Sequence, residues 1–306
     1  MKIFLKASFA FLFAMIITVS CQKEVNDIRY PDFKLKLVIN GSISPDEITH
    51  YISIDYNHRI YGDLYKPYDG EMPGDLTATL SSEDTQYSLR PGFTKYQKFN
   101  GTEISFDSVK TGFVFDNNEI PLVEGKTYIL KVQSESGLSA SASCTIPFKR
   151  NFALKIDTQR IISTDPQYSM YSHYEANLNY TDTPGEQNYY RLLGEIVRYS
   201  HMYGLSISSN NIVPPENSFF TDKGNDGMTS KITFSYIPNS ASDDSVFLKI
   251  YLLNTDKAYY DYHKSIEKYS SGEDPFTEPS PLYTNVTGGL GIFASYTIDS
   301  LVFRLK

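Results

Sequence analysis

Alternation of apolar and hydroxyl-bearing residues is the sequence feature that most constrains the fold of this chain. The clearest case is the run Leu138, Ser139, Ala140, Ser141, Ala142, Ser143, Cys144, Thr145 and Ile146. Successive side chains of a strand point to opposite faces, so this pattern predicts a half-buried β-strand. It also places the Cys144 thiol inside, as a small hydrophobic group and not a nucleophile.

Comparable short runs recur along the chain, separated by turn residues. We expect strands at 34–39, 51–56, 76–80, 87–89, 127–134, 138–146, 176–180, 188–199, 231–237, 246–253 and from 292 to 305. Asn40-Gly41 is a turn pair and should end the first strand. Mixed polarity on both faces of 188–199 indicates an edge-like or partly solvated strand, whereas 246–253 is apolar on both faces and should be central. Residues 57–74 and 205–230 are rich in turn formers and predict long loops.

These patterns predict a mainly β fold with two β-sandwich-like regions and one short C-terminal helix. We expect an N-terminal β-sandwich domain at 34–148, Ig-like or carboxypeptidase-regulatory-like, and a C-terminal β domain at 149–306. The helix is expected at about 256–269, with Thr255 as N-cap and Asp256 in its first turn. Its tyrosines recur at helical spacing, which favours packing on a sheet over a ligand platform.

Three glycines, Gly288, Gly289 and Gly291, precede the last predicted strand. They predict a bulge or a tight crossing, where the backbone needs unusual freedom or close approach. A phosphate-binding loop would need a helix after it, but the residues that follow have a β pattern, which argues against nucleotide binding.

The amino-terminal residues predict export. Lys2 and Lys6 are basic, the stretch from Ile3 to Val19 is almost wholly apolar, and small residues lead into Cys21. This is the pattern of a secretory signal, and the apolar run is short for a spanning helix.

Cys21 at the first mature position makes this a lipoprotein signal, since diacylglycerol transfer requires a thiol there. We therefore expect a signal peptide at 1–20, lipidation of Cys21 and a polar tether at 21–33. An ordinary cleaved signal with an incidental cysteine and an N-terminal anchor helix remain alternatives.

Charge and cysteine content limit the possible partners. The formal net charge is −8, which argues against nucleic acid and against electrostatic docking on anionic membranes. Lipid would therefore hold the protein to a bilayer. Besides Cys21 the chain has only Cys144, so the fold cannot depend on a disulfide.

No catalytic or metal-binding constellation is predicted, and no cofactor. The chain contains five scattered histidines: His50, His58, His173, His201 and His263. Their spacing is not that of metal ligands, and neither a Gly-x-Ser-x-Gly nor a His-Glu-x-x-His motif occurs. Asp222, Asn225 and Asp226, beside Gly224 and Gly227, offer oxygens suited to calcium. Because their spacing fits no standard calcium loop, a solvated turn is the favoured interpretation.

Several segments resemble a Bacteroidetes-type outer-membrane lipoprotein family, the domain of unknown function 4249. Ala258–Tyr262, Asp274–Pro279 and Asn285–Phe293 are similar to its C-terminal signature, and Lys36–Gly41 and Glu124–Pro147 to its N-terminal half. The resemblance implies an outer-membrane lipoprotein commonly encoded beside a TonB-dependent receptor. It carries over no catalytic residue. Gln22-Lys23-Glu24 also resembles an export signal of lipoproteins that face the cell exterior.

The leading hypothesis is a non-enzymatic, surface-exposed lipoprotein that captures a ligand for a TonB-dependent transporter through the loops at 57–74 and 205–230. The sequence does not specify whether the ligand is a small molecule, a glycan or a peptide. A structural or adhesive surface module is the first alternative, and an uncharacterised hydrolase is the second.

Overall fold

The computed structural model describes residues 34–57, 75–100, 103–150, 152–161, 173–200, 204–208, 213, 218–236, 245–271 and 281–305. Apart from Lys34, these residues belong to one compact unit. In this part of the chain the fold is mainly β, with several sandwich-like sheets and one helix, which confirms the predicted fold class. Cys21 and residues 58–74 lie outside the described residues, and the predicted division at 148/149 stays a prediction.

The strands form three sheets. A nine-stranded sheet has the order β12-β11-β15-β16-β1-β2-β6-β5, with β13 also paired to β11; the other sheets are β14-β10-β9 and β4-β3-β7-β8. The strands are β1 (Leu37–Ile43), β2 (Thr49–Tyr56), β3 (Leu76–Ser82), β4 (Thr85–Ser88), β5 (Arg90–Asn100), β6 (Glu103–Asp116), β7 (Thr127–Ser134), β8 (Ser139–Thr145), β9 (Lys155–Ile161), β10 (His173–Thr181), β11 (Tyr189–Ser200), β12 (Gly204–Ser208), β13 (Phe219–Thr221), β14 (Thr229–Tyr236), β15 (Ser245–Thr255) and β16 (Leu290–Arg304).

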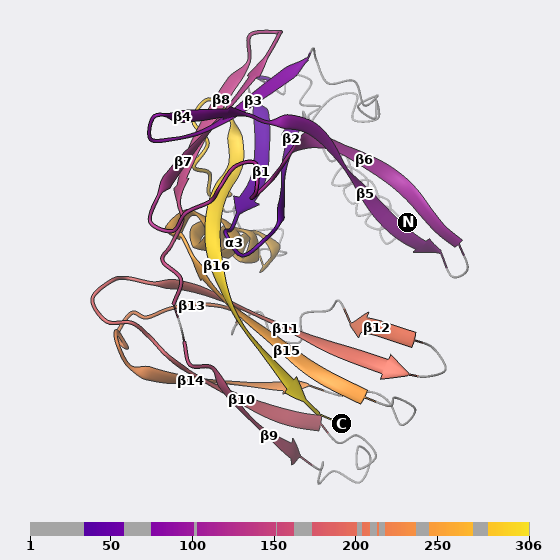
Figure 1. Cartoon of the computed structure of the whole chain (residues 1–306), viewed down its shortest axis with the longest axis vertical. Coiled ribbons are helices and arrows are strands. Elements are labelled where there is room, and N and C mark those ends of the chain that lie inside the picture. The colour runs from indigo at the N-terminus through magenta and orange to yellow at the C-terminus, as the bar shows by residue number, and fades with distance from the viewer. Residues whose placement is uncertain are drawn as a thin grey trace, which may run out of the picture. The chain divides into compact units, whose positions relative to one another are not determined.

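Strand β16 joins the two parts of the nine-stranded sheet (Figure 1). Its first residues pair in parallel with β1, ending at Ile43 opposite Ser295. From Tyr296, opposite Thr255, it pairs antiparallel with β15. The strand therefore exchanges one neighbour for another between Ser295 and Tyr296.

Glycines at the start of β16 permit its close approach to β1. Gly291 has a φ of +95°, and a Cβ atom on it would lie 2.0 Å from the carbonyl oxygen of Ile39. A Cβ atom on Gly289 would lie 2.6 Å from the carbonyl oxygen of Leu37. No side chain fits at such distances, so the close backbone approach predicted for these glycines is confirmed.

Three groups of buried apolar residues form the core. The first joins β1 and β2 to the four-stranded sheet, with Ile39, Ile52 and Leu130 at its centre. The second lies between the three-stranded sheet and β11 and β15, and includes Leu178 and Leu192. A smaller third group lies under helix α3 (Lys257–Ser271).

The structure corrects two strand predictions. Strand β1 continues through Asn40-Gly41 instead of turning, because Gly41 pairs with Ile52 on one side and Phe293 on the other. A Cβ atom on Gly41 would lie 3.0 Å from a side-chain carbon of Ile52, so the glycine serves packing here. Strand β11 is not an edge, because it pairs with β15 along its whole length and with β12 and β13 on its other side. It is partly solvated, because alternate side chains such as Arg191 and Leu193 are only half-buried.

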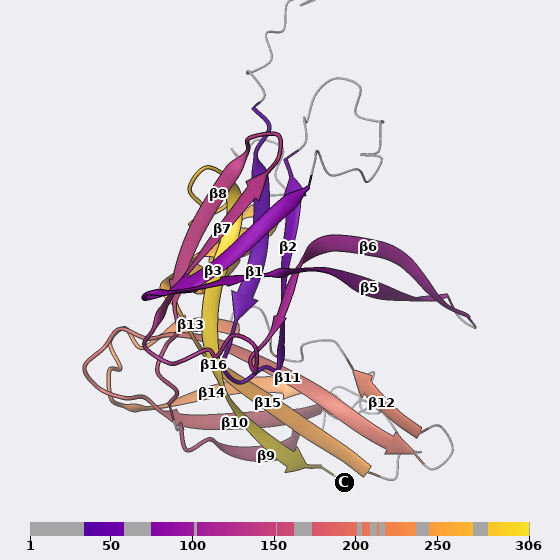
Figure 2. The ribbon, with the colours of Figure 1, turned by 45° about the horizontal axis from the view of Figure 1, so that its top comes forward.

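Some strands were not expected from the sequence. Strands β5 and β6 form a ribbon that pairs with β2 only near its base (Figure 2). Strand β9 was also missed. The predicted loop at 205–230 contains β12, β13 and the start of β14.

Helix α3 begins at Lys257, close to the expected position, but its N-cap is Asp256 and not Thr255. The Asp256 Oδ1 atom accepts the Tyr259 amide at 2.7 Å. The Thr255 hydroxyl instead donates to the carbonyl of Tyr189 at 3.2 Å. Tyr259 is buried and its ring packs edge-on against Tyr296, as predicted, whereas Tyr269 at the other end is exposed.

Within the described residues, no helix has both the length and the apolar character needed to cross a membrane.

Candidate functional site

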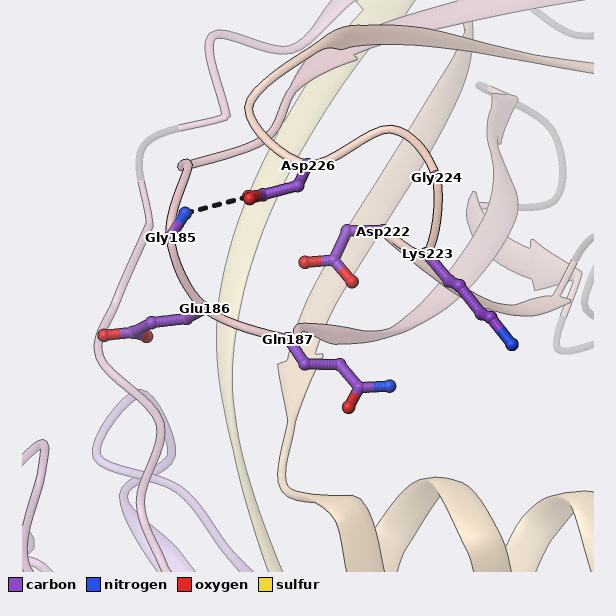
Figure 3. Close-up of a pocket in the computed structure, with 7 residues that line it drawn as sticks. All are labelled: Gly185, Glu186, Gln187, Asp222, Lys223, Gly224 and Asp226. Carbon is purple, nitrogen blue, oxygen red and sulfur yellow. Dashed lines mark hydrogen bonds between the residues drawn. The ribbon is translucent and has the colours of Figure 1, made fainter.

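Two connections meet beside the three-stranded sheet and form an open pocket of about 530 Å³. One joins β10 to β11 and the other joins β13 to β14. Figure 3 shows the two loops facing each other, with the side chain of Asp226 directed at Gly185. The pocket is lined by Gly185, Glu186, Gln187, Asp222, Lys223, Gly224 and Asp226.

Local sequence explains both turns. Gly185 follows Pro184 and has a φ of +99°, a conformation that glycine adopts at little cost. In the second loop, the Asn225 amide donates to the carbonyl of Asp222 at 2.7 Å, and the Met228 amide donates to the carbonyl of Asn225 at 2.9 Å. Two successive turns therefore fold residues 222–228 into a compact loop.

Three carboxylates gather where the loops meet. One oxygen from each of Asp182, Asp222 and Asp226 lies within 4.8 Å of the others. Asp182 and Asp222 are buried, and Asp226 is exposed. Oxygen atoms in such a group are the ligands that calcium prefers.

Protein donors already reach these carboxylates. Asp182 accepts hydrogen bonds from the Tyr190 hydroxyl, from the Asn188 side chain at 3.3 Å and from the Gly227 amide at 2.9 Å. Asp222 Oδ2 accepts the backbone amide of Asn188 at 2.9 Å and its side-chain amide at 3.1 Å.

The donors give the cluster a structural role without a cation. Each buried acid ties its own loop to the other one, and Asp226 adds a third tie by accepting the Gly185 amide at 2.9 Å. Burial, together with the Asp182 carboxylate, raises the pKa of Tyr190, so this hydroxyl stays a donor. The cluster by itself assigns no metal.

The sequence suggested part of this group. Asp222 and Asp226 do lie together, and Asn225 contributes through its backbone to the turn. Asp182 was missed because it lies forty positions earlier in the chain. The turn sequence Thr183-Pro184-Gly185 beside it is the only local signal, and it does not specify which loop it meets.

Other predicted residues are not part of this site. Cys144 is a free, buried cysteine, as expected, and burial raises the pKa of its thiol well above the ordinary value. The described histidines do not converge: His50 Nε2 lies 2.9 Å from Asn117 Oδ1, and His263 lies on α3 against Phe219.

Comparison with known proteins gives one informative match. A family model described as Domain of unknown function (DUF4249) matches residues 23–301. No curated protein matches the chain. Among solved structures, a chain titled "Biofilm associated protein - B domain" aligns over 87% of this chain and 85% of its own, with 7% identity and a TM-score of 0.18. A TM-score this low carries no argument about fold or function.

Proposed function

This chain belongs to the DUF4249 family, and we propose that it works as a surface-exposed outer-membrane lipoprotein that captures a ligand for a TonB-dependent transporter. In this role the protein is not an enzyme. It is held to the membrane by lipid on Cys21 and faces the cell exterior.

The observation that carries the proposal is the amino-terminal signal. Lys2 and Lys6 precede an apolar run, and small residues lead into Cys21. A thiol at that position is the acceptor for a diacylglycerol group, and further acyl chains make the anchoring stable. The family match begins at residue 23, two positions after this cysteine.

The described part of the chain supports ligand capture. The pocket beside Asp222 and Asp226 is open, and its second loop lies within the segment 205–230 for which a binding role was predicted. The loops are held together by hydrogen bonds from the Gly227 amide to Asp182 and from the Asn188 amide to Asp222, so their shape is preset before a ligand arrives. Preset loops on a rigid sheet lose less entropy on binding.

Affinity purification of the full-length lipoprotein from outer membranes in gentle detergent tests the proposal. We expect a large outer-membrane receptor to co-purify, and we expect a Cys21→Ala variant to lose both membrane association and the receptor. A lipoprotein that elutes as a monomer without a receptor would overturn the transporter partnership. If deletion of a neighbouring receptor gene also left its abundance and phenotype unchanged, the adhesive or structural role would be favoured.

A further inference from the structure

A second polar centre lies under α3, where Arg191 of β11 projects between aromatic rings. Its Cζ atom lies 5.1 Å from the ring centroid of Phe219 in β13 and 5.6 Å from that of Tyr259 in α3. Nη1 donates a hydrogen bond to the Tyr259 hydroxyl. Three elements thus hold the guanidinium in one orientation, and the rings favour its positive charge.

The remaining donors of Arg191 are not satisfied in the same way. Its Nε atom is buried and has no hydrogen-bond partner among the described residues. None of the ion pairs in this part of the chain involves Arg191. A buried donor that lacks an acceptor destabilises the folded protein, so an acceptor supplied by a ligand would be favourable here.

The free donors have the geometry of a carboxylate receptor. Nε and Nη2 form one edge of the planar guanidinium, and Nη1 on the other side is already engaged by Tyr259. An arginine edge of this kind binds both oxygens of a carboxylate through two parallel hydrogen bonds. Lysine, with a compact ammonium group, cannot supply the same pair of donors.

The positive charge at this centre comes from Arg191 itself. Lys264 Nζ lies 5.9 Å from the ring centroid of Phe219, on the same aromatic group as Arg191. The His263 ring stacks on Phe219 with centroids 5.4 Å apart. Glu267 pairs with Lys264 at 2.6 Å. Glu47, whose charge also acts on Tyr259, accepts the Tyr296 hydroxyl at 2.6 Å, so among the described residues neither acid forms an ion pair with Arg191.

We propose that Arg191 binds the carboxylate of an acidic ligand where β11, β13 and α3 meet. The ligand class is defined by a carboxylate group, which an acidic sugar and a peptide C-terminus both supply. This site is separate from the acidic pocket, and the proposal needs neither the membrane anchor nor the transporter.

Isothermal titration calorimetry on the full-length, detergent-solubilised protein tests the proposal. The acidic probes are digalacturonate, for an acidic sugar, and N-acetyl-dialanine, for a peptide carboxylate. Their matched neutral probes are the methyl ester and the C-terminal amide. We expect one acidic probe to bind at least tenfold more tightly than its neutral counterpart, and the probe that binds identifies the source of the carboxylate.

Two variants of Arg191 distinguish binding by the guanidinium edge from binding by positive charge alone. Arg191→Gln should weaken binding of that probe at least tenfold, and Arg191→Lys should weaken it similarly while it keeps the charge. Arg90→Gln, at an exposed arginine that pairs with Glu119 at 2.8 Å, should bind as the native protein does. Should Arg191→Gln fail to fold, Arg191→Lys carries the test. Equal binding of acidic and neutral probes, absence of binding by both acidic probes, or native affinity in Arg191→Lys would overturn the proposal.

Discussion

The Asp256 carboxylate accepts the backbone amide of Ser295 at 2.9 Å, which ties the start of α3 to the crossing point of β16. The other carboxylate oxygen caps the helix through the Tyr259 amide at 2.7 Å. Ser295 is the last residue of β16 that pairs with β1, and its hydroxyl donates to the Thr145 carbonyl at 2.9 Å. One carboxylate therefore links the helix cap to the exchange of strand partners.

Stability should fall as this carboxylate ionises. Burial raises the pKa of Asp256 to about 6, against the opposing effect of its hydrogen-bond donors. Because the folded state holds the proton more tightly, the contribution of Asp256 to stability is complete below pH 4 and is lost as pH rises through 6. A shift of this size corresponds to roughly 3 kcal/mol.

Urea unfolding of Asp256→Asn between pH 3.5 and 7 checks this expectation. The variant should lose the decline in stability between pH 4 and 6, while Asp84→Asn, in an exposed turn, should keep it. An unchanged decline in Asp256→Asn would contradict the assignment.

The effect of His263 on the pH dependence of stability should be opposite to that of Asp256. Burial, with a smaller effect of Arg191, lowers the pKa of His263 to about 4. The unfolded chain then binds the proton more tightly, so stability is complete above pH 6.5 and is lost as pH falls through 4. His263→Phe keeps a ring against Phe219 and should remove this loss, which the same unfolding series would measure. A variant that still weakens between pH 6.5 and 4 to the native extent would argue against it.

A matched pair of glycine substitutions tests the close approach of β16 to β1. Gly291 and Gly185 both have positive φ, at +95° and +99°, but a Cβ on Gly291 would lie 2.0 Å from the Ile39 carbonyl oxygen, whereas nothing lies within 4 Å of one on Gly185. Gly185→Ala should cost about 1–2 kcal/mol from backbone strain alone. Gly291→Ala should cost several kcal/mol or prevent folding, as measured by thermal and urea unfolding. Equal losses in the two variants would contradict the close approach.

Period-two patterns were sufficient to predict the mainly β fold, because half-buried strands such as β7 and β8 alternate cleanly. The same signal predicted β15 as a central strand from its two apolar faces. The sequence pattern gave a wrong prediction where tertiary contacts override the local preference of the residues. Asn40-Gly41 has the sequence of a turn, yet its neighbours Ile52 and Phe293 hold it in a strand.

The candidate site was less predictable because it joins distant segments. The sequence places Asp222 and Asp226 in one turn, but nothing local indicates that Asp182 meets them through Asn188 and Gly227. The Thr255 N-cap prediction failed for a related reason. Either Thr255 or Asp256 suits the position, and the contact of Asp256 with Ser295 decides it.

Two aspartates of the candidate site should contribute unequally to the stability of the folded protein. Asp182 is buried and accepts three hydrogen bonds, so Asp182→Ala should cost about 2–3 kcal/mol or more through unsatisfied donors. Asp226 is exposed and accepts the Gly185 amide, so Asp226→Ala should cost about 1 kcal/mol or less. Thermal unfolding with and without calcium tests whether hydrogen bonds alone hold these two loops together. A large calcium-dependent rise in melting temperature that both substitutions abolish would show that a cation, and not hydrogen bonding, organises the loops.

Mass spectrometry of the native amino terminus tests most directly whether lipid on Cys21 holds this protein to the membrane. We expect protein from the membrane fraction to begin at Cys21, with residues 1–20 absent and the mass of a diacylglyceryl group, with any further acyl chain, on that residue. An unmodified amino terminus on freely soluble protein would contradict the lipid anchor and, with it, the proposed partnership with a transporter.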